Sequence, residues 1–188
     1  MSAVTALPRR HRLTVAEYYR MAEAGILKPD DRVELIEGEI IDMPPIGIDH
    51  AYGVTRLTAV FTRKAGTNAI VYSQNPIYLN PHSEPQPDIA LLRYRDDFYR
   101  HTRPGPEDVL LLIEVADSSL RYDREVKLSL YARHAIPEVW IVDLEHQRLE
   151  VYRRPVEDRY LEMLLPKEGE IITPEGLPGC GLELGDLF

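Results

Sequence analysis

The sequence contains a single cysteine, Cys180, so no disulfide can form within the chain. Long apolar runs are absent as well: the stretch from Val109 to Ile113 ends in charge after a few residues, whereas a membrane-spanning helix needs about 20 apolar residues. The basic residues Arg9, Arg10 and Arg12 are not followed by an apolar stretch of signal-peptide length. These absences predict a soluble, cytoplasmic protein with no membrane partner.

Positive charge is also scarce, because 22 Lys and Arg residues face 31 Asp and Glu residues, for a net charge of −9. This weighs against a nucleic-acid substrate, since phosphate binding draws on a positive surface. The acidity is concentrated late in the chain, however: 12 acidic and 5 basic residues follow from Glu138 onward, which leaves 19 acidic and 17 basic before it. Arg121, Arg124 and Lys127 lie along one predicted helix of the near-neutral part, although a solvated helix face explains such charges equally well.

A chain of 188 residues that is 44% apolar can bury one core of moderate size. We therefore expect a single domain over residues 1–188. Its core should span about residues 14–145, and an acidic, strand-rich extension should occupy about residues 146–188.

Hydrophobic periodicity predicts helices that alternate with strands. A capping box that begins at Thr14 predicts a short helix ending near Gly25, and Asp49 is a candidate cap for a second helix ending near Gly66. A third helix is predicted from Leu120 to His134. Strands are predicted at 32–43 in two pieces, 69–79, 88–93, 109–115, 138–143, 148–153 and 160–165. This order indicates an α+β (mixed α/β) fold, with a central mixed sheet flanked by helices and an extra C-terminal antiparallel segment.

Two carboxylates are expected to meet at the end of the two most apolar strands. If these strands form an antiparallel hairpin, Leu91 lies opposite Leu111, and Asp88 lies opposite Glu114. Directly opposed residues point to the same face, with Cβ atoms roughly 4.5 to 5.5 Å apart. Two like charges at the edge of an apolar core need a cation or a proton, and oxygen ligands favour Mg²⁺ or Mn²⁺. The simpler alternative is that each carboxylate ends its strand in solvent.

Lys127 could supply a positive charge beside such a metal. It lies four residues after Asp123, so the two side chains share a helix face. An ordinary surface ion pair is one interpretation. Phosphodiester hydrolysis offers another, because a cation near the metal can stabilise the charge that develops on the phosphate.

Several short stretches, taken in order from Thr14 to Phe188, resemble the Uma family of putative restriction endonucleases, within the PD-(D/E)XK nuclease superfamily and its restriction-endonuclease-like fold. Each stretch is weak alone, and the resemblance depends on their number and order. They are Arg32-Val-Glu-Leu-Ile-Glu-Gly-Glu39, His50, Gln86-Pro-Asp88, Ile113-Glu-Val115 with Asp117-Ser-Ser119, Arg121-Tyr-Asp-Arg124 with Lys127, Tyr131-Ala132, and Ile136-Pro-Glu-Val-Trp-Ile-Val-Asp143.

The resemblance implies metal binding by Asp88, Glu114 and the Val115 carbonyl, with Lys127 as the catalytic lysine. It departs from the superfamily pattern at one place, because the position two residues after the acidic residue is Ala116 rather than lysine. The resemblance then implies that the catalytic lysine, Lys127, lies on the following helix rather than on the strand.

Further candidates follow from the same stretches. The resemblance places His50 and Glu34 among the family's recurring polar positions, which makes them secondary catalytic candidates, although a histidine at a helix start is often a capping or packing residue. Gln86 could orient a water on the metal or could only satisfy backbone groups. Arg121 and Arg124 are candidate substrate contacts, and we expect Trp140 and Tyr131 to lie in the core.

These inferences predict a metal-dependent endonuclease that cleaves nucleic acid, with DNA as the favoured substrate, and that acts as a homodimer. The main alternative is a nucleic-acid-binding or regulatory protein that keeps the fold without turnover, and the net charge of −9 favours it. A phosphatase or nucleotidase that acts on small substrates is a third interpretation of the same residues.

Overall fold

The computed structural model describes residues 10–188, so Arg9 of the basic cluster lies outside the described part. The helices are α1 (Val15–Glu23), α2 (Ile48–Ala65), α3 (Leu120–Tyr122) and α4 (Leu128–Arg133), with short 3₁₀ turns at Pro106–Asp108 and Leu184–Asp186. The strands are β1 (Val33–Ile36), β2 (Glu39–Asp42), β3 (Ala69–Ser73), β4 (Ile89–Arg93), β5 (Val109–Ala116), β6 (Glu138–Asp143), β7 (Arg148–Val156), β8 (Arg159–Leu164), β9 (Ile171–Ile172) and β10 (Leu182–Glu183).

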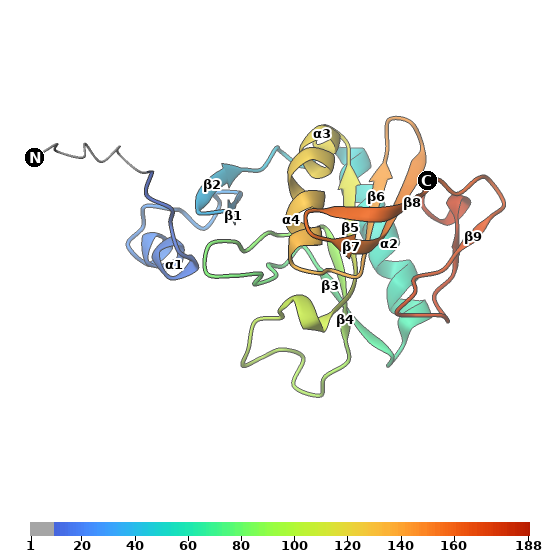
Figure 1. Cartoon of the computed structure of the whole chain (residues 1–188), viewed down its shortest axis with the longest axis horizontal. Helices are drawn as coiled ribbons and strands as arrows, with labels where there is room; N and C mark the ends of the chain where they lie inside the picture. The colour runs from blue at the N-terminus through green and yellow to red at the C-terminus, as the bar shows by residue number, and fades with distance from the viewer. Residues whose placement is uncertain (1–9) are drawn as a thin grey trace, which may run out of the picture.

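A six-stranded sheet in the order β3-β4-β5-β6-β7-β8 forms the centre of the molecule (Figure 1). Strands β5 and β6 pair in parallel, and the other neighbouring pairs of this sheet are antiparallel. The predicted hairpin register is confirmed, because Leu91 pairs with Leu111 and Ile89 pairs with Ile113. A parallel pair needs a crossover connection, and α3 and α4 lie within it. The mixed α+β fold is therefore confirmed.

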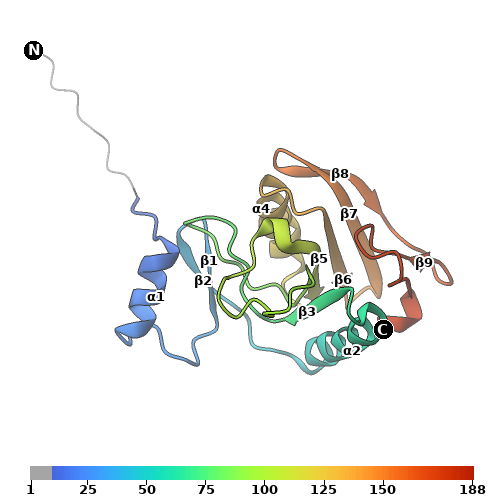
Figure 2. The same ribbon diagram turned by 90° about the horizontal axis from the view of Figure 1, so that it is seen from below.

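Helices cover both faces of this sheet (Figure 2). On one face α2 packs Leu57 and Phe61 into a cluster with Trp140, and on the other face α4 buries Tyr131 against residues that include Leu112. Trp140 and Tyr131 are both fully buried, as predicted. Since every residue of β5 is buried, the polar Glu114 in this strand is enclosed by protein on both sides.

The predicted boundaries are correct for the start of α1 and wrong at two other places. Thr14 caps α1 in the predicted capping box. Helix α2 begins after Gly47, which makes no side-chain capping bond, and Asp49 lies inside the first turn, where its charge suits the helix N-terminus. Strand β3 ends at Ser73 rather than near Leu79, because Gln74 adopts a positive φ of 50° and turns the chain away.

Two other predicted elements also differ in their bounds. The predicted helix from Leu120 to His134 is interrupted by a π-helical turn at Asp123–Lys127. The C-terminal extension packs on the α2 face through Leu177, Leu182 and Leu187, so it shares the main core. Among residues 10–188, no helix is long and apolar enough to cross a membrane.

The turn between β1 and β2 depends on Gly38. Glu37 and Gly38 both have positive φ, 51° and 82°, as a two-residue type I′ hairpin requires. A Cβ atom on Gly38 would lie 2.6 Å from Cβ of Arg12 and 2.9 Å from its Cα. The turn therefore needs glycine both for its backbone conformation and for the close approach of Arg12.

We expect Gly38→Ala to lower the free energy of unfolding measured in urea by more than Gly25→Ala does. Gly25 also has a positive φ, 72°, but a Cβ atom added there would meet nothing within 4 Å. Alanine at Gly25 should therefore cost about 1–2 kcal/mol through its backbone conformation alone. At Gly38 the overlap with Arg12 should add roughly 1–3 kcal/mol. Equal losses in the two variants would contradict the packing of Arg12 on this turn.

Candidate active site

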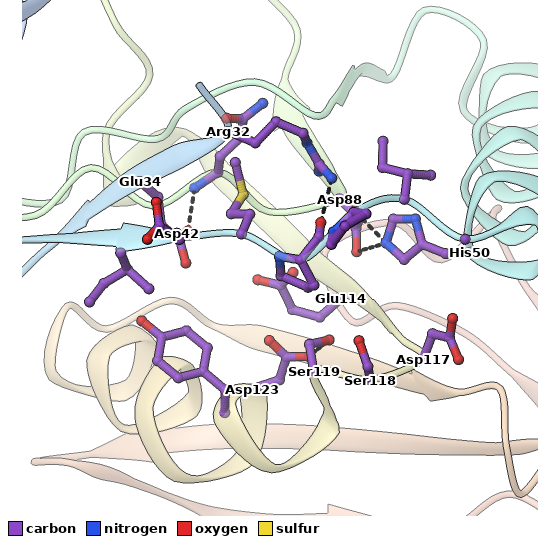
Figure 3. A pocket seen from close by; sticks show the side chains of 18 of the residues that line it. Arg32, Glu34, Asp42, His50, Asp88, Glu114, Asp117, Ser118, Ser119 and Asp123 are labelled. Atoms are coloured by element: carbon purple, nitrogen blue, oxygen red, sulfur yellow. Dashed lines mark hydrogen bonds and ion pairs between the residues drawn. The ribbon is translucent and has the colours of Figure 1, made fainter. Parts of the chain in front are cut away.

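A cavity of about 340 Å³ opens where the β1–β2 hairpin, the start of α2, and the crossover after β5 come together. Its lining is rich in charge, and Figure 3 shows these side chains converging on the space between the elements. The acidic side chains are Glu34, Asp42, Asp88, Glu114, Asp117 and Asp123, and the basic ones are Arg32, His50 and Lys127. Carboxylates therefore outnumber cations in this pocket.

Asp88 directly precedes β4 and is held by the strand beside it and by α2. Its Oδ2 accepts a hydrogen bond from the Val115 backbone N–H at 2.9 Å. Nε2 of His50 lies 3.1 Å from each carboxylate oxygen. A carboxylate held by these groups has a fixed orientation toward the pocket.

His50 lies in the first turn of α2 and faces Asp88. The hydrogen bond to Asp88 raises the pKa of His50 above its ordinary value, although partial burial opposes this. Nδ1 of the same ring is buried and has no hydrogen-bond partner among residues 10–188. His50 is therefore a partner of Asp88 rather than a simple helix cap, because its polar contact is with that carboxylate.

Glu114 projects from β5 and is 3% exposed. Its Oε1 accepts a hydrogen bond from the Tyr131 hydroxyl at 2.5 Å and lies 3.3 Å from Nζ of Lys127. Burial raises the pKa of Glu114 to about 8, even though the Lys127 charge opposes this shift. Glu114 is therefore held by the Tyr131 hydroxyl and by Lys127 at the edge of the pocket that it lines.

Lys127 is a buried cation rather than half of a surface ion pair. Its side chain is 8% exposed, and Nζ lies 3.4 Å from Glu34 and 3.3 Å from Glu114, with Asp123 at 4.0 Å. Burial lowers the pKa of Lys127, but the nearby carboxylates outweigh burial, and the pKa lies above its ordinary value. The ammonium therefore stays charged at neutral pH.

The π-helical turn places Lys127 and Asp123 in the pocket together. In this turn the Leu128 N–H donates to the Asp123 carbonyl, which widens the helix by one residue. Ser119 donates to Asp123 at 2.6 Å. On the outer side Arg124 pairs with buried Glu150, and this pair holds the turn against β7.

Most of the residues that the sequence singled out come together here. Asp88, Glu114, Lys127, His50, Glu34 and Gln86 all line the cavity. Val115 lies beside them, because its N–H binds Asp88. Gln86 also satisfies backbone groups, since its side-chain nitrogen donates to the Gln74 carbonyl at 2.6 Å.

The two helix arginines are not brought into the pocket. Arg121 pairs with Glu125 at 2.9 Å on an exposed surface, and Arg124 pairs with Glu150 and, at 3.7 Å, with Asp143. Helical spacing could have indicated the Arg121–Glu125 pair, which is four residues apart, but not the partners of Arg124, because Glu150 and Asp143 are distant in the sequence.

Two groups of the site, Arg32 and the Tyr131 hydroxyl, were not predicted from the sequence to have a role. Arg32 opens one of the stretches that carry the family resemblance, which was the available signal. For Tyr131 the apolar periodicity predicted burial but could not predict a bond to Glu114.

Any metal in this pocket would need ligands beyond side chains. Among residues 10–188, no three His, Cys, Asp or Glu side chains are grouped closely enough to hold a metal ion. Two carboxylates completed by a backbone carbonyl and waters remain compatible with this arrangement, because hard cations keep several water ligands.

We expect Lys127→Met to lower the free energy of unfolding by about 3–5 kcal/mol, because it leaves Glu34 and Glu114 buried without their cation. Denaturation in urea measures this loss. The double variant Lys127→Met/Glu114→Gln should recover part of it, and exposed Lys28→Met should change stability by less than about 0.5 kcal/mol. A loss in Lys127→Met as small as that of Lys28→Met would contradict the buried ion cluster.

Comparison with known proteins identifies the family. The family model Uma2, described as "Putative restriction endonuclease", matches residues 15–185. The chain is also similar to a crystal structure at 1.96 Å resolution of "a putative nuclease belonging to DUF820" from Anabaena variabilis, with 18% identity, a TM-score of 0.71, and coverage of 94% of this chain and 97% of that chain. A search of curated proteins gave no match. The structural likeness shows the shared fold, and the family model spans nearly the whole described chain: the protein belongs to the Uma2 family of putative restriction endonucleases.

Proposed function

We propose that this protein is a divalent-metal-dependent endonuclease that hydrolyses phosphodiester bonds of nucleic acid, with DNA as the favoured substrate. The observation that carries the proposal is the convergence of Asp88, Glu114 and Lys127 on one cavity. Membership of the family supports nuclease activity. The fold shared with a protein described as a nuclease agrees with it.

The pocket suits Mg²⁺ or Mn²⁺ by its donor chemistry. Asp88 and Glu114 both line the cavity and offer carboxylate oxygens. We propose these two residues and the Val115 carbonyl as metal ligands. When bound, the metal would act as a Lewis acid and would lower the pKa of a bound water.

Each remaining residue has a role that follows from its contacts. Lys127 stays charged, so it can stabilise negative charge that develops on a phosphate oxygen. Glu34 holds the ammonium in place from β1. His50 fixes the carboxylate of Asp88, and Gln86, in the same lining, can orient a water.

A non-catalytic nucleic-acid-binding protein is the second candidate, and one observation favours it. Six carboxylates and three basic residues line the cavity, so without a bound cation the pocket repels phosphate. A protein that uses the fold for regulation would bind nucleic acid elsewhere on its surface. Cleavage separates the two candidates directly.

The cleavage assay should use plasmid, single-stranded DNA, RNA and nucleotides, each with Mg²⁺, Mn²⁺ or EDTA. We expect wild-type protein to cleave nucleic acid with either metal and to be inactive in EDTA. Glu114→Gln should lose the activity by at least about 100-fold, because it removes a charged ligand. Glu157→Gln, on the hairpin between β7 and β8, is the matched control.

Three results would contradict the proposal. Cleavage of nucleotides alone would indicate a phosphatase or nucleotidase. Equal cleavage by wild type and Glu114→Gln would indicate a contaminating nuclease, and the absence of any metal-dependent cleavage would favour the non-catalytic candidate.

Mn²⁺ should also raise the melting temperature of the wild-type protein. Metal binds the folded site and relieves the repulsion between its carboxylates, so linkage predicts a gain of about 2.7 kcal/mol when free metal is about 100 times its Kd. For a domain of this size that is a rise of several degrees, roughly 2–4 °C per kcal/mol. Differential scanning fluorimetry measures the shift, which Asp88→Asn should largely abolish and Glu157→Gln should retain. An equal shift in Asp88→Asn would reject this metal site.

We also propose that the protein acts as a homodimer, since cutting both strands of a duplex needs two active sites or two encounters with one site. Light scattering on the purified protein measures the oligomeric state. We propose the cytoplasm as its location, in agreement with Cys180, which is a buried free thiol.

A further inference from the structure

The basic residues of the pocket differ in whether they have a carboxylate partner. Lys127 lies within 4.0 Å of three carboxylates, those of Glu34, Glu114 and Asp123. His50 contacts the carboxylate of Asp88. A phosphate that enters this pocket therefore meets cations already engaged with carboxylates, with Arg32 as the exception.

Arg32 immediately precedes β1 and lines the cavity. One guanidinium nitrogen donates a hydrogen bond to the Pro44 carbonyl at 2.5 Å. Within residues 10–188, no carboxylate forms an ion pair with this guanidinium, so its charge is not neutralised by the protein. Figure 3 shows the side chain extending across the pocket toward the side where Asp88 and His50 lie.

Arg32 shares its cavity with the other polar groups of the site. His50 and Asp88 line the same cavity, so a ligand bound beside this pair lies in the pocket that Arg32 lines.

The hydrogen bond to Pro44 orients Arg32 and occupies only one of its N–H donors. A guanidinium has five N–H groups in a planar fork that matches two oxygens of a phosphate. The Pro44 carbonyl occupies one of these donors. The backbone around it is fixed as well, because the Met43 N–H donates to the Arg32 carbonyl at 2.8 Å.

We propose that Arg32 is the residue that binds a phosphate group of the substrate at the mouth of this pocket. This inference rests on the proposed function, because it assigns the anion-binding residue of the same site. Arg121 and Arg124 differ from Arg32 in that each is paired with a carboxylate, Glu125 and Glu150 respectively.

The test compares binding and cleavage by wild type, Arg32→Met, Arg32→Lys and Arg63→Met. Arg63 is an exposed arginine in the last turn of α2, far along the helix from His50, and it forms no ion pair within the described chain. Fluorescence anisotropy with a labelled oligonucleotide gives Kd over a range of salt concentrations. Cleavage kinetics with Mn²⁺ give KM and kcat.

We expect Arg32→Met to weaken binding by about 10- to 100-fold and to raise KM, because a charge-assisted bond is lost. The slope of log Kd against log salt should fall by about 0.7 to 0.9, which corresponds to one phosphate contact. Arg32→Lys should keep the slope but lose affinity several-fold, because a lysine is a point charge without the planar fork. Arg63→Met should match wild type.

The outcomes separate this inference from the proposed function. If wild type binds and cleaves nucleic acid but Arg32→Met and Arg32→Lys both match Arg63→Met, the role of Arg32 is wrong and the nuclease proposal stands. If wild type neither binds nor cleaves any nucleic acid, both are wrong. If Arg32→Met fails to fold, Arg32→Lys decides: a several-fold loss of affinity supports the role of Arg32, and wild-type affinity and KM overturn it.

Discussion

Lys127 joins three separate parts of the chain through one ammonium group. It lies 3.3 Å from Glu114 of β5, 3.4 Å from Glu34 of β1, and 4.0 Å from Asp123 of its own π-helical turn. A small sheet, the central sheet and a helix therefore meet at this cation. Removing it would leave buried carboxylates without a partner, which is among the most costly changes a protein core can undergo.

The position of this cluster follows from the topology. Parallel pairing of β5 and β6 requires a crossover, and the crossover places the π-helical turn beside the end of β5. Asp88 and Glu114 reach the same place because β4 and β5 form a hairpin in the predicted register. The result is an acidic pocket in which Lys127 lies beside Glu34, Glu114 and Asp123, while Asp88 lies beside His50.

Those parts of the site that depend on local pattern and register could be predicted from the sequence. The two apolar strands indicated the pairing of Leu91 with Leu111, and from it followed the approach of Asp88 and Glu114. Spacing alone could not exclude an ordinary surface ion pair for Lys127. The burial of Lys127 against β1 and β5 depends on contacts between distant segments. The same limit explains Arg124, whose partner Glu150 is on β7. A π-helical turn has no clear sequence signal, so the predicted helix ran unbroken through it.

The roles proposed for Lys127 and Arg32 both need a phosphate that is held beside a cation at Asp88 and Glu114. The anomalous difference map of crystals soaked in MnCl₂ would show whether a cation binds there. We expect a strong peak within ligand distance of both carboxylates, at about 2.0–2.3 Å from each bound oxygen. A peak elsewhere, or no peak at a manganese concentration that supports cleavage, would contradict it.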